Sequence, residues 1–243
     1  MPDDPSLHPI LDRPLKREPI AFTDAICAAL DEELASGLAT LGLPATEAQR
    51  QTLVASLRFL SEWNAVINLT AIREPHEMLV QHVLDSLSIV PHLPPPVLGQ
   101  TMTVLDVGSG GGFPALPLAV LRPDLAVVSI DSVRKKTDYV GRAAVYLDLP
   151  NLRSVHSRVE DHRDTYQVVL SRAYASLRDF AKSAGHASPK DGTGTFLAMK
   201  GKSPDEEIAE LAKTGWVAER VVRLAVPLLA AERTLVWLKR KAK

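Results

Sequence analysis

The chain has 243 residues, 46% of them hydrophobic, and a formal net charge of −1. The length fits one large domain, or one domain with an extension, and the hydrophobic fraction is enough for a sizeable core. The longest apolar runs, such as 115–121 and 224–231, are too short to span a membrane, and the N-terminus lacks the apolar segment of a signal peptide, so we expect a cytoplasmic protein with no membrane contact.

The N-terminal part differs in composition from the rest. Residues 1–20 are rich in proline and aspartate, and we expect a disordered tail there. Residues 1–40 carry eight acidic and three basic side chains, so their charge is −5 and that of the remaining chain is +4. The basic excess includes the C-terminal run 239–243. Such asymmetry is compatible with a basic face for nucleic-acid phosphates.

Two helices are expected next. Apolar side chains recur at helical spacing from Phe22 to about Leu41. The one cysteine, Cys27, lies in this stretch, so no intramolecular disulfide can form and we expect the residue to be buried. Thr46 followed by Gln49 predicts a capping box that begins the second helix.

A third helix is expected from about 75 to 89. Asn64 and Asn68 fall four apart near the end of the second helix, and His82 and Asp85 share a face of the third. Because buried polar groups need partners, we expect these side chains to fasten the helices to a sheet; the other interpretation is direct contact with substrate. The proline-rich run 91–96 marks a boundary, so residues 21–96 are predicted to form an N-terminal helical extension.

After this boundary, apolar runs alternate with helical patterns. The expected strands lie near 103–107, 126–131, 153–157, 167–172 and 195–200, and the expected helices near 113–121, 134–147, 175–187 and 204–213. Two β-like runs, 217–226 and 234–240, close the chain and are expected to pair antiparallel. The pattern predicts an α/β domain over residues 97–243, with a mainly parallel sheet covered by helices on both faces.

A glycine-rich turn follows the first of these strands. The apolar run ends in Asp106, and within five residues come four glycines, Gly108 and 110–112. Strand, glycine turn and helix in this order let the backbone approach a ligand closely and direct free N–H groups at it. We therefore expect a nucleotide-like cofactor at this turn.

The glycine spacing bears on which cofactor binds. The dinucleotide fingerprint G-x-G-x-x-G places glycine or alanine third. Counted from Gly108 that position is Phe113, but counted from Gly110 it is Ala115, so NAD is not excluded on the glycines alone. With Asp106 ahead of it, the spacing from Gly108 resembles the first motif of S-adenosylmethionine (SAM) methyltransferases.

Asp131 ends the second predicted strand, 23 positions after Gly108. An acid at about this distance accepts hydrogen bonds from a ribose, which both SAM and NAD contain. The other interpretation of Asp131 is a helix N-cap.

Several segments resemble, in the same order, the RsmG family, also called glucose-inhibited division protein B. They are residues 64–72, 82–87, 105–114, 130–132, 157–160, 171–173 and 199–201. The resemblance implies a Rossmann-like class I SAM-dependent methyltransferase fold, with a seven-stranded sheet and an antiparallel last strand. It also implies methylation of N7 of one guanosine in the decoding-region loop of 16S rRNA, with the small ribosomal subunit as partner. We expect a monomer.

The resemblance also assigns the site. Together with the spacing of Asp131, it implies cofactor contacts from Asp106, Gly108, Gly110, Phe113, Asp131, Val159, Glu160 and Arg172. Val159 and Glu160 belong to the adenine end, although Glu160 alone also fits an exposed acid that opens a helix. The site is expected to need no metal, since His82 and Asp85 lack further ligands at useful spacing.

The chemistry sets what the substrate side needs. Guanine N7 already carries a lone pair, so no general base is expected, and the protein mainly aligns the reactants. An arginine that grips both O6 and N7 would block the nucleophile. We therefore expect Arg172 or Lys200 to contact O6 or a phosphate; the other interpretation of Arg172 is a structural ion pair.

Other functions stay open at this point. A methyltransferase acting on another RNA or on a small molecule is one, and an NAD-dependent oxidoreductase is another. A non-catalytic RNA-binding module is a third, although it would be expected to lose the glycines or Asp131. Departures from the family pattern at Ala115 and 135–139 bear on the RNA contacts, and the basic run 134–136 is either such a contact or a solvated face.

Overall fold

The computed structural model describes residues 16, 18–202 and 204–241. Most of the tail predicted over 1–20 lies outside these ranges, as do the last two residues of the basic C-terminal run. Across the described ranges, no helix combines the length and the apolar character needed to cross a bilayer.

Seven strands form one mixed sheet in the order β3-β2-β1-β4-β5-β7-β6. The strands are β1 (Met102–Val107), β2 (Leu125–Asp131), β3 (Leu152–His156), β4 (Val168–Arg172), β5 (Thr195–Lys200), β6 (Trp216–Leu224) and β7 (Arg233–Arg240). The first five pair in parallel, whereas β7 is antiparallel to both of its neighbours. The five alternating strands and the closing antiparallel pair are thus confirmed, and the fold is the expected class I methyltransferase architecture.

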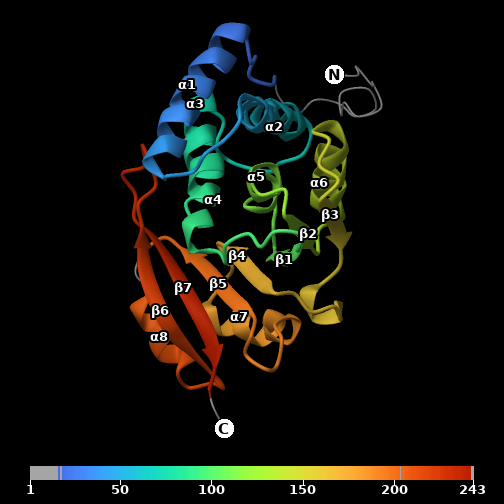
Figure 1. The fold of residues 1–243 in the computed structure, drawn as a ribbon. Coiled ribbons are helices and arrows are strands. Elements are labelled where there is room, and N and C mark those ends of the chain that lie inside the picture. Colours follow the sequence, from blue (N-terminus) through green and yellow to red (C-terminus); the bar gives the residue numbers. More distant parts are fainter. Residues whose placement is uncertain (1–15, 17, 203, 242–243) are drawn as a thin grey trace.

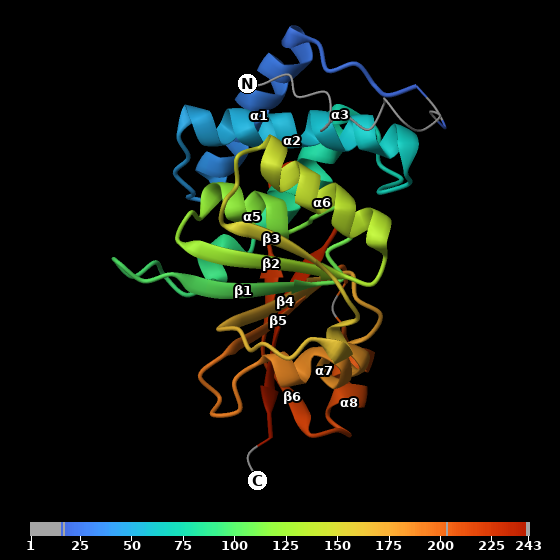
Figure 2. The ribbon, with the colours of Figure 1, turned by 90° about the vertical axis from the view of Figure 1, so that its right-hand side faces the viewer.

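Helices cover both faces of this sheet (Figure 2). α5 (Ala115–Leu121) and α6 (Arg134–Tyr146) lie on one face, and α7 (Leu177–Ala184) and α8 (Asp205–Leu211) on the other. α2 (Glu47–Val66) lies over α5 and α6, and α1 (Asp24–Thr40) packs against α2 (Figure 1). A single apolar cluster joins these N-terminal helices to α5, α6 and the sheet, so the core continues across the boundary predicted at residue 96. The division into 21–96 and 97–243 stays a prediction.

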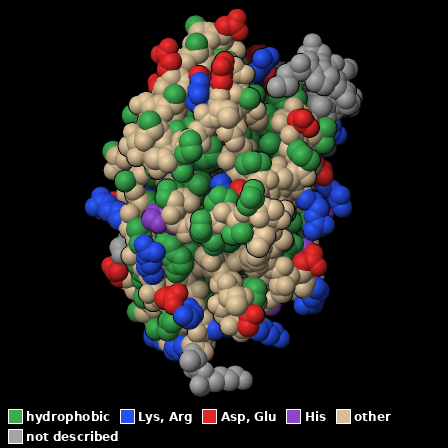
Figure 3. All heavy atoms as spheres, viewed as in Figure 1, with side chains coloured by type: hydrophobic (Ala, Val, Ile, Leu, Met, Phe, Trp, Pro, Cys, Tyr) green, Lys and Arg blue, Asp and Glu red, His purple; other side chains and the backbone are tan. Residues whose placement is uncertain are grey.

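The surface repeats the charge asymmetry of the sequence. In the view of Figure 3, acidic side chains gather over the end that carries α1, while many Lys and Arg side chains lie over the half that contains the sheet. The acidic end carries Asp24, Asp31, Glu32 and Glu33 of α1.

Thr46 caps α2 as predicted. Its hydroxyl oxygen accepts the Gln49 N–H at 3.2 Å, and Gln49 Oε1 accepts the Thr46 N–H at 3.0 Å. Thr46→Ala should therefore lower the free energy of unfolding by about 1 kcal/mol. Thr52→Ala in the same helix is the control, because alanine is the better former within a helix and no loss is expected there. Urea denaturation of both variants checks this, and equal losses would contradict the capping role.

The helix predicted over 75–89 has an unusual geometry. α3 (Pro75–Met78) runs into a π-helical segment, η3 (Leu79–Leu84), and then into α4 (Asp85–Leu87); a 3-10 turn, η4 (Val90–His92), follows. π-Helical turns are rare and are frequent at functional sites. The pair expected to share a helix face, His82 and Asp85, lies within this segment and directly after it.

One local expectation, the burial of Cys27, is wrong, and two helix boundaries lie close to but not at the expected positions. Cys27 is only half-buried, because α1 packs on the core with one side. Asn68 lies beyond the end of α2, where the backbone has become extended. The helix expected from 175 begins at Leu177, because the Ser176 side chain accepts the N–H of Asp179 and caps it.

Candidate cofactor and substrate site

The carboxyl ends of the parallel strands meet at one edge of the sheet, where ligands of open α/β folds bind. β1 leads into the glycine turn, β2 ends at Asp131, β4 at Arg172 and β5 at Lys200. Because β7 runs antiparallel and pairs Thr234 with Lys200, its first residue, Arg233, arrives at the same edge. The fold thus brings the strand-end candidates together and adds Arg233 to them.

The glycine turn uses its glycines in two ways. Gly110 has a φ of +58°, and a Cβ there would meet only the loop's own Gly108 oxygen, at 3.9 Å, so the space above it is open. Gly112 has a φ of +82°, and a Cβ there would lie 2.6 Å from Leu116. Gly110 therefore leaves room for a ligand, whereas Gly112 lets the turn pack on the start of α5.

Asp131 ties this turn to the end of β2. Its Oδ2 accepts the Gly110 N–H at 3.1 Å, and its Oδ1 accepts the Val133 N–H at 2.8 Å. Lys136 Nζ lies 3.8 Å from Oδ2. The N-cap position of α6 is Val133, so Asp131 is not itself the cap. Each carboxylate oxygen keeps lone-pair capacity for another donor, as a ribose contact requires.

Asp106 lies beneath the turn and is fully buried. Its Oδ2 accepts the Ala115 N–H at 3.2 Å, and its Oδ1 has no hydrogen-bond partner among the described residues. Burial raises the pKa of Asp106 to about 7. The side chain therefore holds the start of α5 from below, and the predicted cofactor role of Asp106 stays a prediction.

This burial predicts a pH effect on stability. Because the folded pKa of Asp106, about 7, exceeds the unfolded value, its contribution to stability is full below about pH 4 and is lost as the pH rises through about 7. Asp106→Asn keeps an oxygen for the Ala115 N–H and removes this titration. The variant should gain stability relative to the wild type from about pH 5 to about pH 8. Urea denaturation across this range measures it, and a constant difference would contradict the assignment.

Phe113 lies behind the turn, with 3% of its surface exposed. Its ring stacks on His82 at 4.7 Å between centroids, and the guanidinium of Arg172 lies 5.6 Å from the Phe113 centroid. Burial, together with the nearby Arg172, lowers the pKa of His82 to about 3, so this imidazole is neutral. His82 Nε2 lies 3.0 Å from Thr70 Oγ1. His82 thus contacts Thr70 and the glycine turn rather than a strand of the sheet, and the expected contact of Phe113 with a cofactor stays a prediction.

The other predicted side chains divide by exposure. Val159 and Glu160 lie in a 3-10 turn, η5 (Val159–Asp161), shortly after β3; Val159 is buried and Glu160 is exposed. Asn64 Oδ1 accepts the N–H groups of Leu69 and Thr70, so it fastens the turn after α2 and not the sheet. The adenine role of Val159 and Glu160 stays a prediction.

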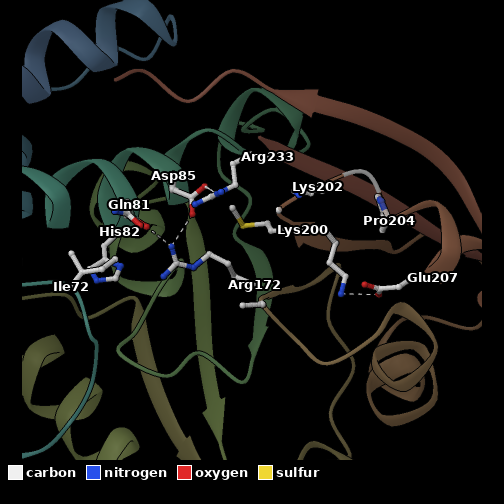
Figure 4. Close-up of a pocket in the computed structure, with 13 residues that line it drawn as sticks. Ile72, Gln81, His82, Asp85, Arg172, Lys200, Lys202, Pro204, Glu207 and Arg233 are labelled. Carbon is white, nitrogen blue, oxygen red and sulfur yellow. Dashed lines mark hydrogen bonds and ion pairs between the residues drawn. The ribbon is translucent and has the colours of Figure 1, made fainter. Parts of the chain in front are cut away.

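A cavity of about 590 Å³ lies beside the ends of β4 and β5 (Figure 4). Its lining includes four cationic and two acidic side chains besides neutral His82: Arg172, Lys200, Lys202 and Arg233, with Asp85 and Glu207. The cationic excess favours an anionic ligand. Arg172 connects this cavity to the glycine turn through Phe113.

Arg172 and Lys200 differ in the donors they keep. The ammonium of Lys200 lies 2.8 Å from Glu207 Oε2, 3.2 Å from the backbone carbonyl oxygen of Tyr174 and 3.4 Å from that of Ala175. These three acceptors account for its three hydrogens. Arg172 donates both of its hydrogen bonds to described residues from Nη1, and its Nε and Nη2 have no acceptor among those residues. Arg172 is therefore the better placed of the two to contact a ligand.

Several residues of this cavity were not expected from the sequence: Gln81, Lys202, Pro204, Glu207 and Arg233. Arg233 directly precedes the predicted strand 234–240, so an antiparallel closing strand implied its place at this edge. No sequence signal indicates that the backbone oxygen of Gln81 accepts a hydrogen bond from Arg172.

The family model and the similar sequences point to one family. The family model described as rRNA small subunit methyltransferase G matches residues 49–236. Ribosomal RNA small subunit methyltransferase G of Bordetella pertussis is 46% identical over 215 residues, covering 86% of this chain and 93% of that protein. The protein of the same name from Burkholderia ambifaria is 46% identical, covering 85% and 91%. A solved SAM-dependent methyltransferase of Aquifex aeolicus is 20% identical, with a TM-score of 0.49, covering 67% and 92%.

Proposed function

The chain belongs to the rRNA small subunit methyltransferase G family, and on this premise we propose that it transfers a methyl group from SAM to N7 of a guanosine in 16S rRNA. The observation that carries the proposal is that the glycine turn, Asp131 and the cationic cavity lie along one edge of the sheet.

The residues at this edge fit SAM. The open space over Gly110 leaves room for the cofactor, and the carboxylate of Asp131 retains acceptor capacity for the ribose hydroxyls. Val159 and Glu160, after β3, would meet the adenine end. When bound there, SAM supplies a methyl group already activated by its sulfonium.

The side chains on the substrate side orient the base. Guanine N7 needs no deprotonation, so this chemistry requires no general base from the cavity. Its two carboxylates, Asp85 and Glu207, are paired with cationic side chains. Arg172 offers its Nε and Nη2 to O6 or to a phosphate and thereby leaves N7 free. Lys200 holds Glu207 and the segment after β4, and would contact substrate only by giving up one of these bonds.

Two measurements on the purified protein test the proposal. Calorimetric titration should show binding of S-adenosylhomocysteine and none of NAD, whereas the reverse would favour an oxidoreductase. Methyl transfer from labelled SAM should reach small-subunit rRNA and not large-subunit rRNA or free guanosine. Transfer to free guanosine or to a small molecule alone would support the alternative substrate class. That the enzyme is a monomer and acts in the cytoplasm stays a prediction.

A further inference from the structure

Asp85 joins two arginines that come from different strands. Its Oδ2 accepts a hydrogen bond from Arg172 Nη1 of β4 at 3.0 Å, and its Oδ1 accepts one from Arg233 Nε of β7 at 2.9 Å (Figure 4). The residue is only 3% exposed. One buried carboxylate therefore fixes two guanidinium groups, and the three side chains together carry a net charge of +1.

The π-helical segment adds a second fixed point. The Asp85 N–H donates to the carbonyls of Val80 and His82, and the Gln81 carbonyl between them accepts a hydrogen bond from Arg172 Nη1 at 2.7 Å. Both hydrogens of Arg172 Nη1 are thus used on one helical segment. Phe113 supports the same guanidinium from the side of the glycine turn.

Each arginine keeps N–H donors that no described residue accepts. Nε and Nη2 of Arg172 have no acceptor among the described residues. Arg233 uses Nε on Asp85 and Nη1 on the Glu232 carbonyl, and its Nη2 likewise has no described acceptor. Both side chains line the cavity. A structural tether of the helix to the sheet would need only one of them.

We propose that Asp85 is a positioning residue that presents Arg172 and Arg233 together as a phosphate-binding site for the RNA backbone at the mouth of the cavity. This rests on the proposed function, since it names the part of the RNA that the cavity holds. Preoriented guanidinium groups bind phosphate oxygens through paired hydrogen bonds and supply charge without blocking guanine N7. The phosphate, and not O6, is then the ligand of Arg172.

Arg233→Gln tests the site without leaving Asp85 unpaired. Arg223→Gln is the matched control, because Arg223 belongs to the same β6–β7 hairpin, pairs with Glu232 and does not line the cavity. Losing one phosphate contact should raise the KM for rRNA by about 10-fold or more. It should also lower the slope of log affinity against log salt by about 0.7. The control should move neither, and binding of S-adenosylhomocysteine should be unchanged in both variants.

Asp85→Asn separates positioning from bulk charge. The substitution raises the net charge by one, so general attraction predicts tighter RNA binding, whereas loss of positioning predicts weaker binding and a higher KM. If this variant does not fold, as thermal unfolding will show, the Arg233→Gln comparison decides alone. Wild-type KM and salt slope in Arg233→Gln, or tighter binding in Asp85→Asn, would overturn the proposal. A wild-type protein that does not methylate rRNA would instead overturn the proposed function.

Discussion

Asp131→Ala is expected to weaken SAM binding by about 100-fold, because hydrogen bonds to a charged group contribute about 1.5–3 kcal/mol each. The carboxylate anchors the turn through the Gly110 N–H and the start of α6 through the Val133 N–H, and it is the proposed ribose acceptor. Its removal therefore costs the ribose bonds and frees the loop that would border the cofactor. Methyl transfer at low SAM concentration should fall in proportion.

Calorimetry with SAM and with S-adenosylhomocysteine measures this loss. Asp138→Ala is the matched control, since Asp138 is exposed on α6 and does not contact the turn. Asp131→Asn keeps the shape and one acceptor, so its loss should lie between those of the alanine variant and the wild type. Equal affinities in Asp131→Ala and Asp138→Ala would contradict the assignment of the cofactor site.

Arg172→Ala is expected to lower kcat/KM for rRNA by about 100- to 1000-fold, because it removes a charge-assisted contact to the RNA and takes one of two partners from the buried Asp85 carboxylate. The affinity for S-adenosylhomocysteine should change only a few-fold, because the glycine turn and Asp131 remain. Arg172→Lys keeps the charge, but one ammonium cannot bond Asp85 and Gln81 and also present a planar edge to the RNA. It should therefore rescue little of the loss.

Steady-state kinetics with rRNA as the varied substrate checks this, with Arg178→Ala on the exposed side of α7 as the control. If Arg172 were only a structural ion pair, its loss would lower the unfolding temperature and leave kcat/KM of the folded enzyme close to the wild type. That outcome would contradict a substrate role for Arg172.

Features that depend on local sequence were predictable. Three features depend on only a few neighbouring residues each: the glycine turn, the acid that ends β2 and the Thr46 capping box. The structure has all three where they were expected. The alternation of strands and helices likewise predicted the sheet, since parallel strands need crossover helices.

Features that depend on distant contacts were not predictable. The sequence indicates that Asp85 and His82 are polar residues on a helix, but not that Asp85 meets Arg172 and Arg233. The spacing of apolar residues does not reveal the π-helical segment, because the hydrogen bonding changes over only six residues. The complete burial of Asp106 beneath the turn depends on packing and was likewise not predictable from the motif.

The measurement that tests the central claim most directly is nucleoside mass spectrometry of 16S rRNA from cells with and without this gene. Deletion is expected to remove one 7-methylguanosine, which the wild-type gene should restore and a gene encoding Asp131→Ala should not. An unchanged 7-methylguanosine level after deletion would contradict the account and leave a methyltransferase fold whose substrate lies elsewhere.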